Sequence, residues 1–163
     1  MADKTKKQTN VTDSVRDYYE SQHWKYRYDS EKGLFRMYMR LHTENVDACE
    51  VRTLVRNEEG FTTFVIFPFK VPEKKRVLAA DYISRANYRL LLGCFEMNFR
   101  DGEIQYKTPC LCGNVRLEPE LIERQVCEGI QMVEQYGEGL VDVLFRGVSA
   151  EEAIRKIQEA EQD

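Results

Sequence analysis

The chain has 163 residues, with 28 acidic against 24 basic side chains and a formal net charge of -4. A single domain is expected at this length, and an apolar fraction of 42% is typical of a folded globular protein. The acidic balance does not favour a nucleic-acid partner. The longest apolar run, 61–69, is too short to cross a membrane, and residues 1–10 lack the apolar core of a secretory signal. We therefore expect a cytoplasmic protein with no membrane partner, a disordered tail over 1–10 and one domain over 11–163.

The domain begins with a helical pattern followed by a hairpin pattern. Apolar residues at helical spacing over 11–22, with Asn10 available as N-cap, predict a short amphipathic helix. Apolar and polar residues then alternate over 24–28 and again over 35–41. Gly33 can take positive φ in the loop between them, so the pattern predicts a β-hairpin with one buried face.

Two further strands are expected over 46–56 and 61–69, joined by a turn at 57–60. The second of them has apolar residues on both faces, one with Phe61, Val65 and Phe67 and the other with Phe64 and Ile66. A strand that is apolar on both faces is expected at the centre of a sheet. Pro68 cannot donate a ladder hydrogen bond and is predicted to mark the end of the strand.

The next segments predict a second helix and a second hairpin. A broad apolar stripe over 72–92 indicates an amphipathic helix that ends at Gly93. Alternation over 94–99 and 103–108, around Asp101-Gly102, predicts a hairpin with a type I′ turn.

The last third of the chain returns to helical spacing. One long helix is expected over 117–144, with a break after Tyr136 because Gly137 and Gly139 each cost about 1 kcal/mol in a helix interior. A capping box at 149–152 begins a short terminal helix. The resulting order, α-β-β-β-β-α-β-β-α-α, predicts an α+β fold in which helices pack on one face of an antiparallel sheet.

Five cysteines without an export signal indicate reduced thiols rather than disulfides. Cys49 and Cys94 lie in apolar stretches and are interpreted as buried side chains. Cys110, Cys112 and Cys127 could supply three thiolates to a metal or take a redox role, but structural zinc usually has four ligands. We predict no metal site and no cofactor, and the role of these three cysteines stays open.

Several separated motifs suggest a family. In chain order they are VPEKKR at 71–76, DYISRANY at 81–88, GCFEMN at 93–98, DGEIQYK at 101–107, YGEGL at 136–140 and SAEEAI at 149–154. Together they resemble the YbjN family, described as candidate bacterial sensory transduction regulators, over about residues 11–160. The resemblance implies the fold of type III secretion chaperones, which are small acidic α+β proteins that form homodimers and bind unfolded segments of other proteins.

The motifs that usually carry catalysis are missing from the sequence: it contains no GxxxxGK[ST], GxGxxG, HExxH or GxSxG. We therefore predict a protein that is not an enzyme. The alternation of aromatic and basic residues over 24–28 could stack nucleic-acid bases, but any half-buried strand shows it, and we predict no nucleic-acid partner.

The remaining hypothesis is protein binding. A sheet with helices on one face leaves its other face in need of cover, and exposed apolar patches usually mark contact surfaces. We predict a homodimer and an unidentified protein partner, bound by sheet or second-helix residues. The candidates are Phe64, Ile66, Tyr82, Arg85 and Arg89. The alternative is a small-molecule sensor or an enzyme with a site in the cleft between sheet and helices.

Overall fold

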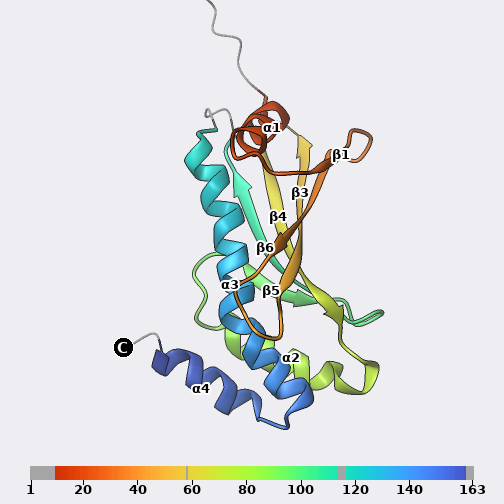
Figure 1. The fold of residues 1–163 in the computed structure, drawn as a ribbon, viewed down its shortest axis with the longest axis vertical. Helices are drawn as coiled ribbons and strands as arrows, with labels where there is room; N and C mark the ends of the chain where they lie inside the picture. Colours follow the sequence, from red (N-terminus) through yellow and green to blue (C-terminus); the bar gives the residue numbers. More distant parts are fainter. Residues whose placement is uncertain (1–9, 58, 114–116, 161–163) are drawn as a thin grey trace, which may run out of the picture.

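A six-stranded sheet and four α-helices form the described part of this computed structural model, which comprises residues 10–57, 59–113 and 117–160 (Figure 1). The helices are α1 (Val11–Ser21), α2 (Arg76–Asn87), α3 (Pro119–Phe145) and α4 (Ala150–Ala160), and a 3-10 turn (Glu73–Lys75) leads into α2. The strands are β1 (Arg27–Asp29), β2 (Leu34–Arg40), β3 (Ala48–Asn57), β4 (Gly60–Lys70), β5 (Cys94–Met97) and β6 (Glu103–Leu111). This order confirms the predicted α+β fold. Most of the predicted tail, residues 1–9, lies outside the described residues.

The strands pair antiparallel throughout, in the order β1-β2-β3-β4-β6-β5. The strand over 61–69 was predicted to be central, and β4 indeed lies between β3 and β6. The prediction that Pro68 ends this strand was wrong, since β4 continues to Lys70. The pairing of β4 with β6 changes register between Ile66 and Lys70, so the proline lies where the ladder is already irregular.

Helix α1 packs on the sheet through a cluster of aromatic rings. Asn10 caps it as predicted, because its side-chain oxygen accepts from the Asp13 backbone amide at 2.7 Å. The strand predicted over 24–28 is shorter and later, at Arg27–Asp29. The reason is that Trp24 folds back to contact Tyr19, with ring centroids 5.6 Å apart, instead of pairing in the sheet.

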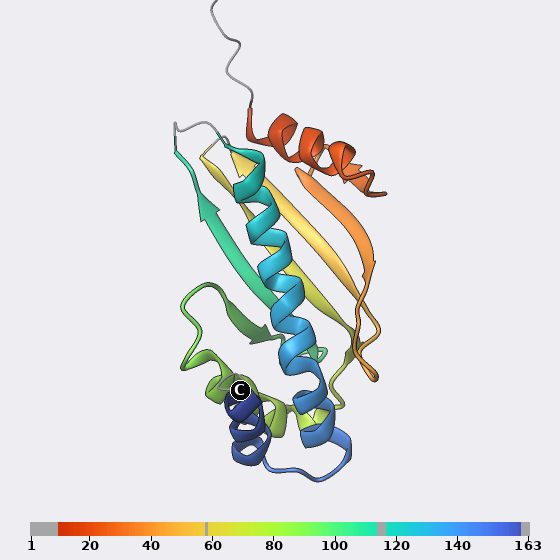
Figure 2. The ribbon, with the colours of Figure 1, turned by 60° about the vertical axis from the view of Figure 1, so that its left-hand side comes forward.

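Helix α3 crosses the same face of the sheet as one continuous helix of 27 residues, with α1 across its upper end (Figure 2). The predicted break after Tyr136 is therefore wrong. Gly137 lies against Val46, where an added Cβ would be 3.1 Å from a side-chain methyl, and Gly139 lies against the Tyr82 hydroxyl. These glycines let the helix approach its neighbours closely, and packing of this kind offsets their low helix propensity.

Helix α2 ends earlier than predicted, at Asn87 rather than near Gly93. The Asn87 side chain accepts from the Phe95 amide at 2.7 Å and donates to the Phe95 carbonyl at 2.8 Å. It thereby binds both backbone groups of one residue in β5. Residues 88–92 leave the helix so that the chain can return to the sheet.

The hairpin of β5 and β6 is confirmed, but its turn is not type I′. Such a turn needs positive φ at both central residues, and only Gly102, with φ of 80°, has it; Asp101 does not. The Gly102 amide donates to the Asn98 carbonyl at 2.7 Å, which closes a longer loop.

Helices α2 and α4 gather at the C-terminal end of α3, at the lower end of the molecule in Figure 1. The predicted cap of α4 is present, since the Glu152 amide donates to Ser149 Oγ at 3.2 Å. Among the described residues, no helix combines the length and the apolar composition required to span a membrane.

Candidate functional site

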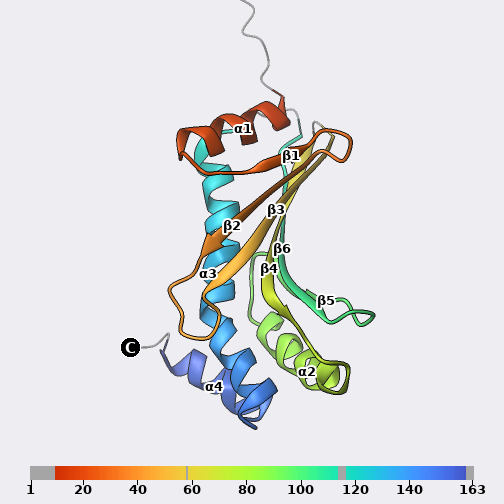
Figure 3. The ribbon, with the colours of Figure 1, turned by 45° about the vertical axis from the view of Figure 1, so that its right-hand side comes forward.

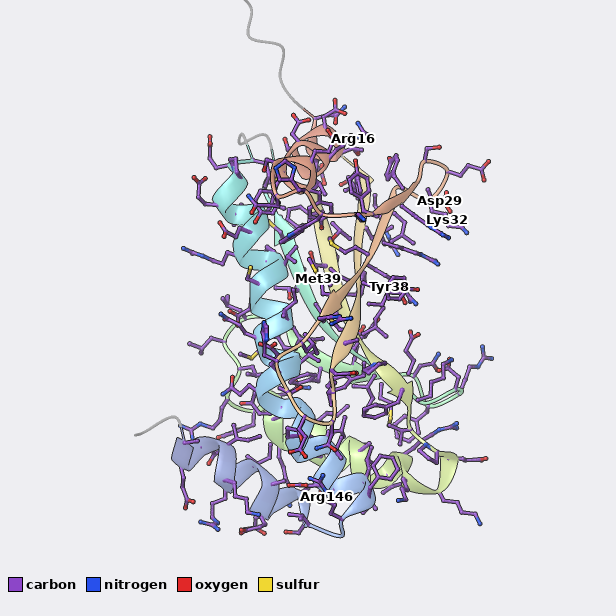
Figure 4. All side chains as sticks on the ribbon, in the orientation of Figure 1. Arg16, Asp29, Lys32, Tyr38, Met39 and Arg146 are labelled. Carbon is purple, nitrogen blue, oxygen red and sulfur yellow. The ribbon has the colours of Figure 1, made fainter. Side chains whose placement is uncertain are left out.

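The sheet has one covered face and one open face. Figure 3 shows α1 and α3 on one side of the central strands, and no element of the described chain packs over the other side. At β2, Met39 points toward α3 and Tyr38 points away from it (Figure 4). We call the surface formed by the outward side chains of β1 to β6 the open face.

The open face contains a hollow of about 450 Å³. Its apolar floor is formed by Leu34, Leu54 and Phe64, from three neighbouring strands. Its polar lining consists of Lys32, Arg52, Arg56 and Gln105. An apolar floor with a cationic lining suits a ligand that is both apolar and acidic.

Phe64 and Ile66 lie on this face, as predicted from the alternation in β4. Phe64 is half-buried in the floor of the hollow, whereas Ile66 is only 4% exposed. Ile66 stands in register between Glu50 and Gln105, whose longer side chains flank it. The apolar part of the open face is therefore smaller than the sequence suggests, and binding through Ile66 stays a prediction.

Ion pairs occupy the middle of the open face. Arg52 donates to Glu50 at 2.7 Å and lies 3.7 Å from Glu103, and Lys107 lies 2.5 Å from Glu96. The hydrogen bond to Glu50 raises the pKa of Arg52, and the hydrogen bond to Glu96 raises the pKa of Lys107. Both cations thus remain charged, with their carboxylates fixed beside them.

The remaining predicted residues lie away from the sheet face, Tyr82 and Arg85 on α2 and Arg89 just after its end. Tyr82 is 1% exposed and donates to the Tyr136 carbonyl at 2.7 Å, so its predicted place on a binding surface is wrong: it belongs to the core. Arg85 and Arg89 are exposed and line a hollow of about 360 Å³ between α2 and α4. Arg85 is paired with Asp81 at 2.9 Å.

An exposed and mostly apolar segment follows α2 at residues 88–92, and Arg89 lies within it. Tyr88 is 92% exposed and Leu91 is 98% exposed, and Leu92 is half-exposed. Large apolar side chains grouped in this state are typical of a contact surface. The sequence pattern placed them inside a helix and therefore did not single them out.

The cysteines do not form a visible metal centre. Cys110 is buried, whereas Cys112 and Cys127 are partly exposed, and all five cysteines are free. Within residues 10–57, 59–113 and 117–160, no group of three or more His, Cys, Asp or Glu side chains is placed to hold a metal ion. Burial raises the pKa of Cys49 to about 12, and this makes its thiol a poor nucleophile at neutral pH.

One part of the open face could not be predicted from the sequence, the part formed by Leu34, Leu54, Arg36 and Arg52. The alternation along each strand indicated which side chains face outward. The register that brings these four together, Leu34 opposite Leu54 and Arg36 opposite Arg52, is set by long-range pairing and leaves no local pattern.

No protein-family model matches the sequence. A comparison with curated proteins also finds no match. Among solved structures, the chain is similar to YbjN from E. coli, which is described as a candidate transcription regulator. The TM-score is 0.54 at 12% sequence identity, and the match covers 79% of this chain and 95% of YbjN.

The chain has a YbjN-like fold. The resemblance seen in the sequence motifs is thereby confirmed at the level of the fold. At 12% identity the likeness does not extend to a shared activity, because one fold hosts many functions. The open face and the segment 88–92 are the surfaces of the described chain that bear on its function.

Proposed function

We propose that this protein is a non-catalytic regulatory or chaperone-like domain that binds another polypeptide on the open face of its sheet. The observation that supports this most strongly is the hollow with an apolar floor at Leu34, Leu54 and Phe64. Sheet faces in single domains are usually covered by a second layer. A partner chain on the open face would supply that layer.

We further propose that the domain is a homodimer, formed through the segment 88–92 and the adjoining surface of α2. A two-fold interface places each patch against its own copy, so the patch must be self-complementary. The apolar side chains of Tyr88 and Leu91 meet this condition. The open face does not, because its excess of cationic side chains would repel a second copy.

Partner binding is tested by affinity capture from native lysate of the source organism. We expect the wild-type protein to retain a stoichiometric protein and Phe64→Asp to lose it, because a carboxylate in the apolar floor is costly to bury. Leu54→Gln is a milder second variant in the same floor. Leu91→Glu, on the other surface, should retain the partner.

The capture result is read together with urea unfolding, which shows that each variant is folded. Equal retention by the wild type and both floor variants would contradict the proposal. So would a specific metabolite that raises the melting temperature of a protein that retains no polypeptide, because that result would favour a small-molecule sensor.

The dimer is tested by light scattering. We expect the wild-type protein to have twice the chain mass of 19.2 kDa and Leu91→Glu to be monomeric, because the charge would have to be buried in the interface. Tyr38→Glu, on the open face, should remain dimeric. A wild-type protein that is monomeric at every concentration would disprove the dimer.

A further inference from the structure

We propose that the open face recognises an acidic segment of its partner, in which apolar and carboxylate side chains alternate at about 7 Å. This inference rests on the proposed function and specifies the chemistry of the partner. It follows from the charges, register and spacing of the side chains beside the hollow.

Three arginines stand side by side across three strands. Arg27 is directly opposite Arg36 in the β1–β2 pair, and Arg36 is directly opposite Arg52 in the β2–β3 pair. Like charges at directly opposite positions destabilise a sheet. Features that weaken a fold in this way are typical of functional sites.

These charges are only partly neutralised. Arg52 is paired with Glu50 and Glu103, but within the described part of the chain neither Arg27 nor Arg36 has an acidic side chain within salt-bridge distance. The outward strand residues include seven cations and four acids. The cations are Arg27, Arg36, Arg40, Arg52, Arg56, Lys70 and Lys107, and the acids are Asp29, Glu50, Glu96 and Glu103. The open face is thus positive on a chain whose net charge is -4.

The outward side chains of β2 alternate in character. Leu34 is followed by Arg36, then by Tyr38, which is 78% exposed, and then by Arg40. Outward residues of one strand are spaced about 7 Å apart. An extended segment has the same spacing between alternate side chains, so apolar residues over Leu34 and Tyr38 would place carboxylates over both arginines.

The arginines also favour a carboxylate partner. A guanidinium group binds a carboxylate through two parallel hydrogen bonds, which adds geometric specificity. A phosphate can accept the same pair of hydrogen bonds, but a nucleic-acid strand carries a phosphate at every nucleotide and does not alternate acidic with apolar groups, as the outward residues of β2 require. We therefore favour an acidic polypeptide over a nucleic acid.

The test uses a fluorescein-labelled peptide in which the sequence leucine, serine, glutamate, serine is repeated three times. Binding is measured by fluorescence anisotropy at low and at high salt. One control peptide has lysine in place of glutamate, and a labelled oligouridine tests for phosphate recognition. The variants are Arg36→Glu on the open face and Arg124→Glu on α3, which have the same charge change.

We expect the acidic peptide to bind the wild type and Arg124→Glu equally and to bind Arg36→Glu about tenfold more weakly or worse. Salt should weaken binding, and the lysine peptide should not bind. Equal binding by Arg36→Glu and wild type, or by the two peptides, would overturn the inference. Tighter, Arg36-dependent binding of oligouridine would also overturn it.

The two proposals can fail separately. If Phe64→Asp abolishes partner capture but the acidic peptide does not bind, the charge inference is wrong and the proposed function stands. If Phe64→Asp leaves capture unchanged, the open face is not the partner site, whatever the peptide does.

Discussion

A row of three buried threonines crosses the covered face of the sheet. Thr53, Thr63 and Thr108 are paired in register on β3, β4 and β6, and all three are buried. At one end, Thr53 Oγ1 forms a 2.6 Å hydrogen bond with the Tyr19 hydroxyl. At the other end, Thr108 Oγ1 has no hydrogen-bond partner among the described residues. The same residue type therefore has opposite energetic roles at the two ends.

This contrast predicts different effects of the same substitution. Thr53→Val leaves the buried Tyr19 hydroxyl without its partner and should lower the free energy of unfolding by about 1 to 3 kcal/mol. Thr108→Val removes an unpartnered hydroxyl and keeps the side-chain shape, so it should be neutral or stabilising by up to about 1 kcal/mol. Urea unfolding measures both. Equal destabilisation by the two variants would refute the prediction.

At the scale of elements, the packing of α3 on the sheet depends on glycines whose role is set by contacts with other elements and not by the neighbouring sequence. An added Cβ at Gly129 would lie 2.6 Å from a methyl group of Val65, in the centre of the sheet, whereas at Gly137 the nearest methyl group, on Val46, is 3.1 Å away. The first distance requires a shift of the strand or helix. The second requires only a small adjustment.

We therefore expect Gly129→Ala to destabilise the protein more than Gly137→Ala. The higher helix propensity of alanine raises the free energy of unfolding by up to about 1 kcal/mol at either position. Overpacking lowers it by about 1 to 3 kcal/mol where the surrounding core cannot rearrange. Gly129→Ala should thus lower the urea midpoint, while Gly137→Ala should leave it nearly unchanged. If Gly129→Ala is the more stable of the two, α3 does not pack at the distance described.

The elements that the sequence predicted correctly are those with local signals. Alternation in β4 assigned Phe64 and Val65 to opposite faces because the period of a strand is a property of the strand itself. The end of α2 was missed because the partner of Asn87 is the backbone of Phe95 on another element. The row formed by Arg27, Arg36 and Arg52 was missed for a similar reason, since only the strand register places these arginines opposite one another.

At the scale of the whole molecule, buried tyrosines from several elements tie stability to pH. Tyr19 on α1, Tyr82 on α2 and Tyr106 on β6 are each at most 1% exposed, and burial raises the pKa of all three above the ordinary value of 10.0. Tyr18 is affected in the same way, with its pKa raised to about 12. Each of these hydroxyls stays protonated in the folded protein at a pH where it ionises in the unfolded chain.

The sign of the effect follows from proton linkage. Above pH 10 the unfolded state binds fewer protons than the folded state, so the free energy of unfolding falls as the pH rises, by about 1.4 kcal/mol per pH unit for each such tyrosine. Below pH 10 this contribution is fully present. We expect Tyr82→Phe to make the alkaline fall shallower, whatever its effect on stability at neutral pH. Urea unfolding at about pH 8 and about pH 11 measures the slope, and an identical slope for Tyr82→Phe and the wild type would mean that Tyr82 does not keep its proton in the folded core.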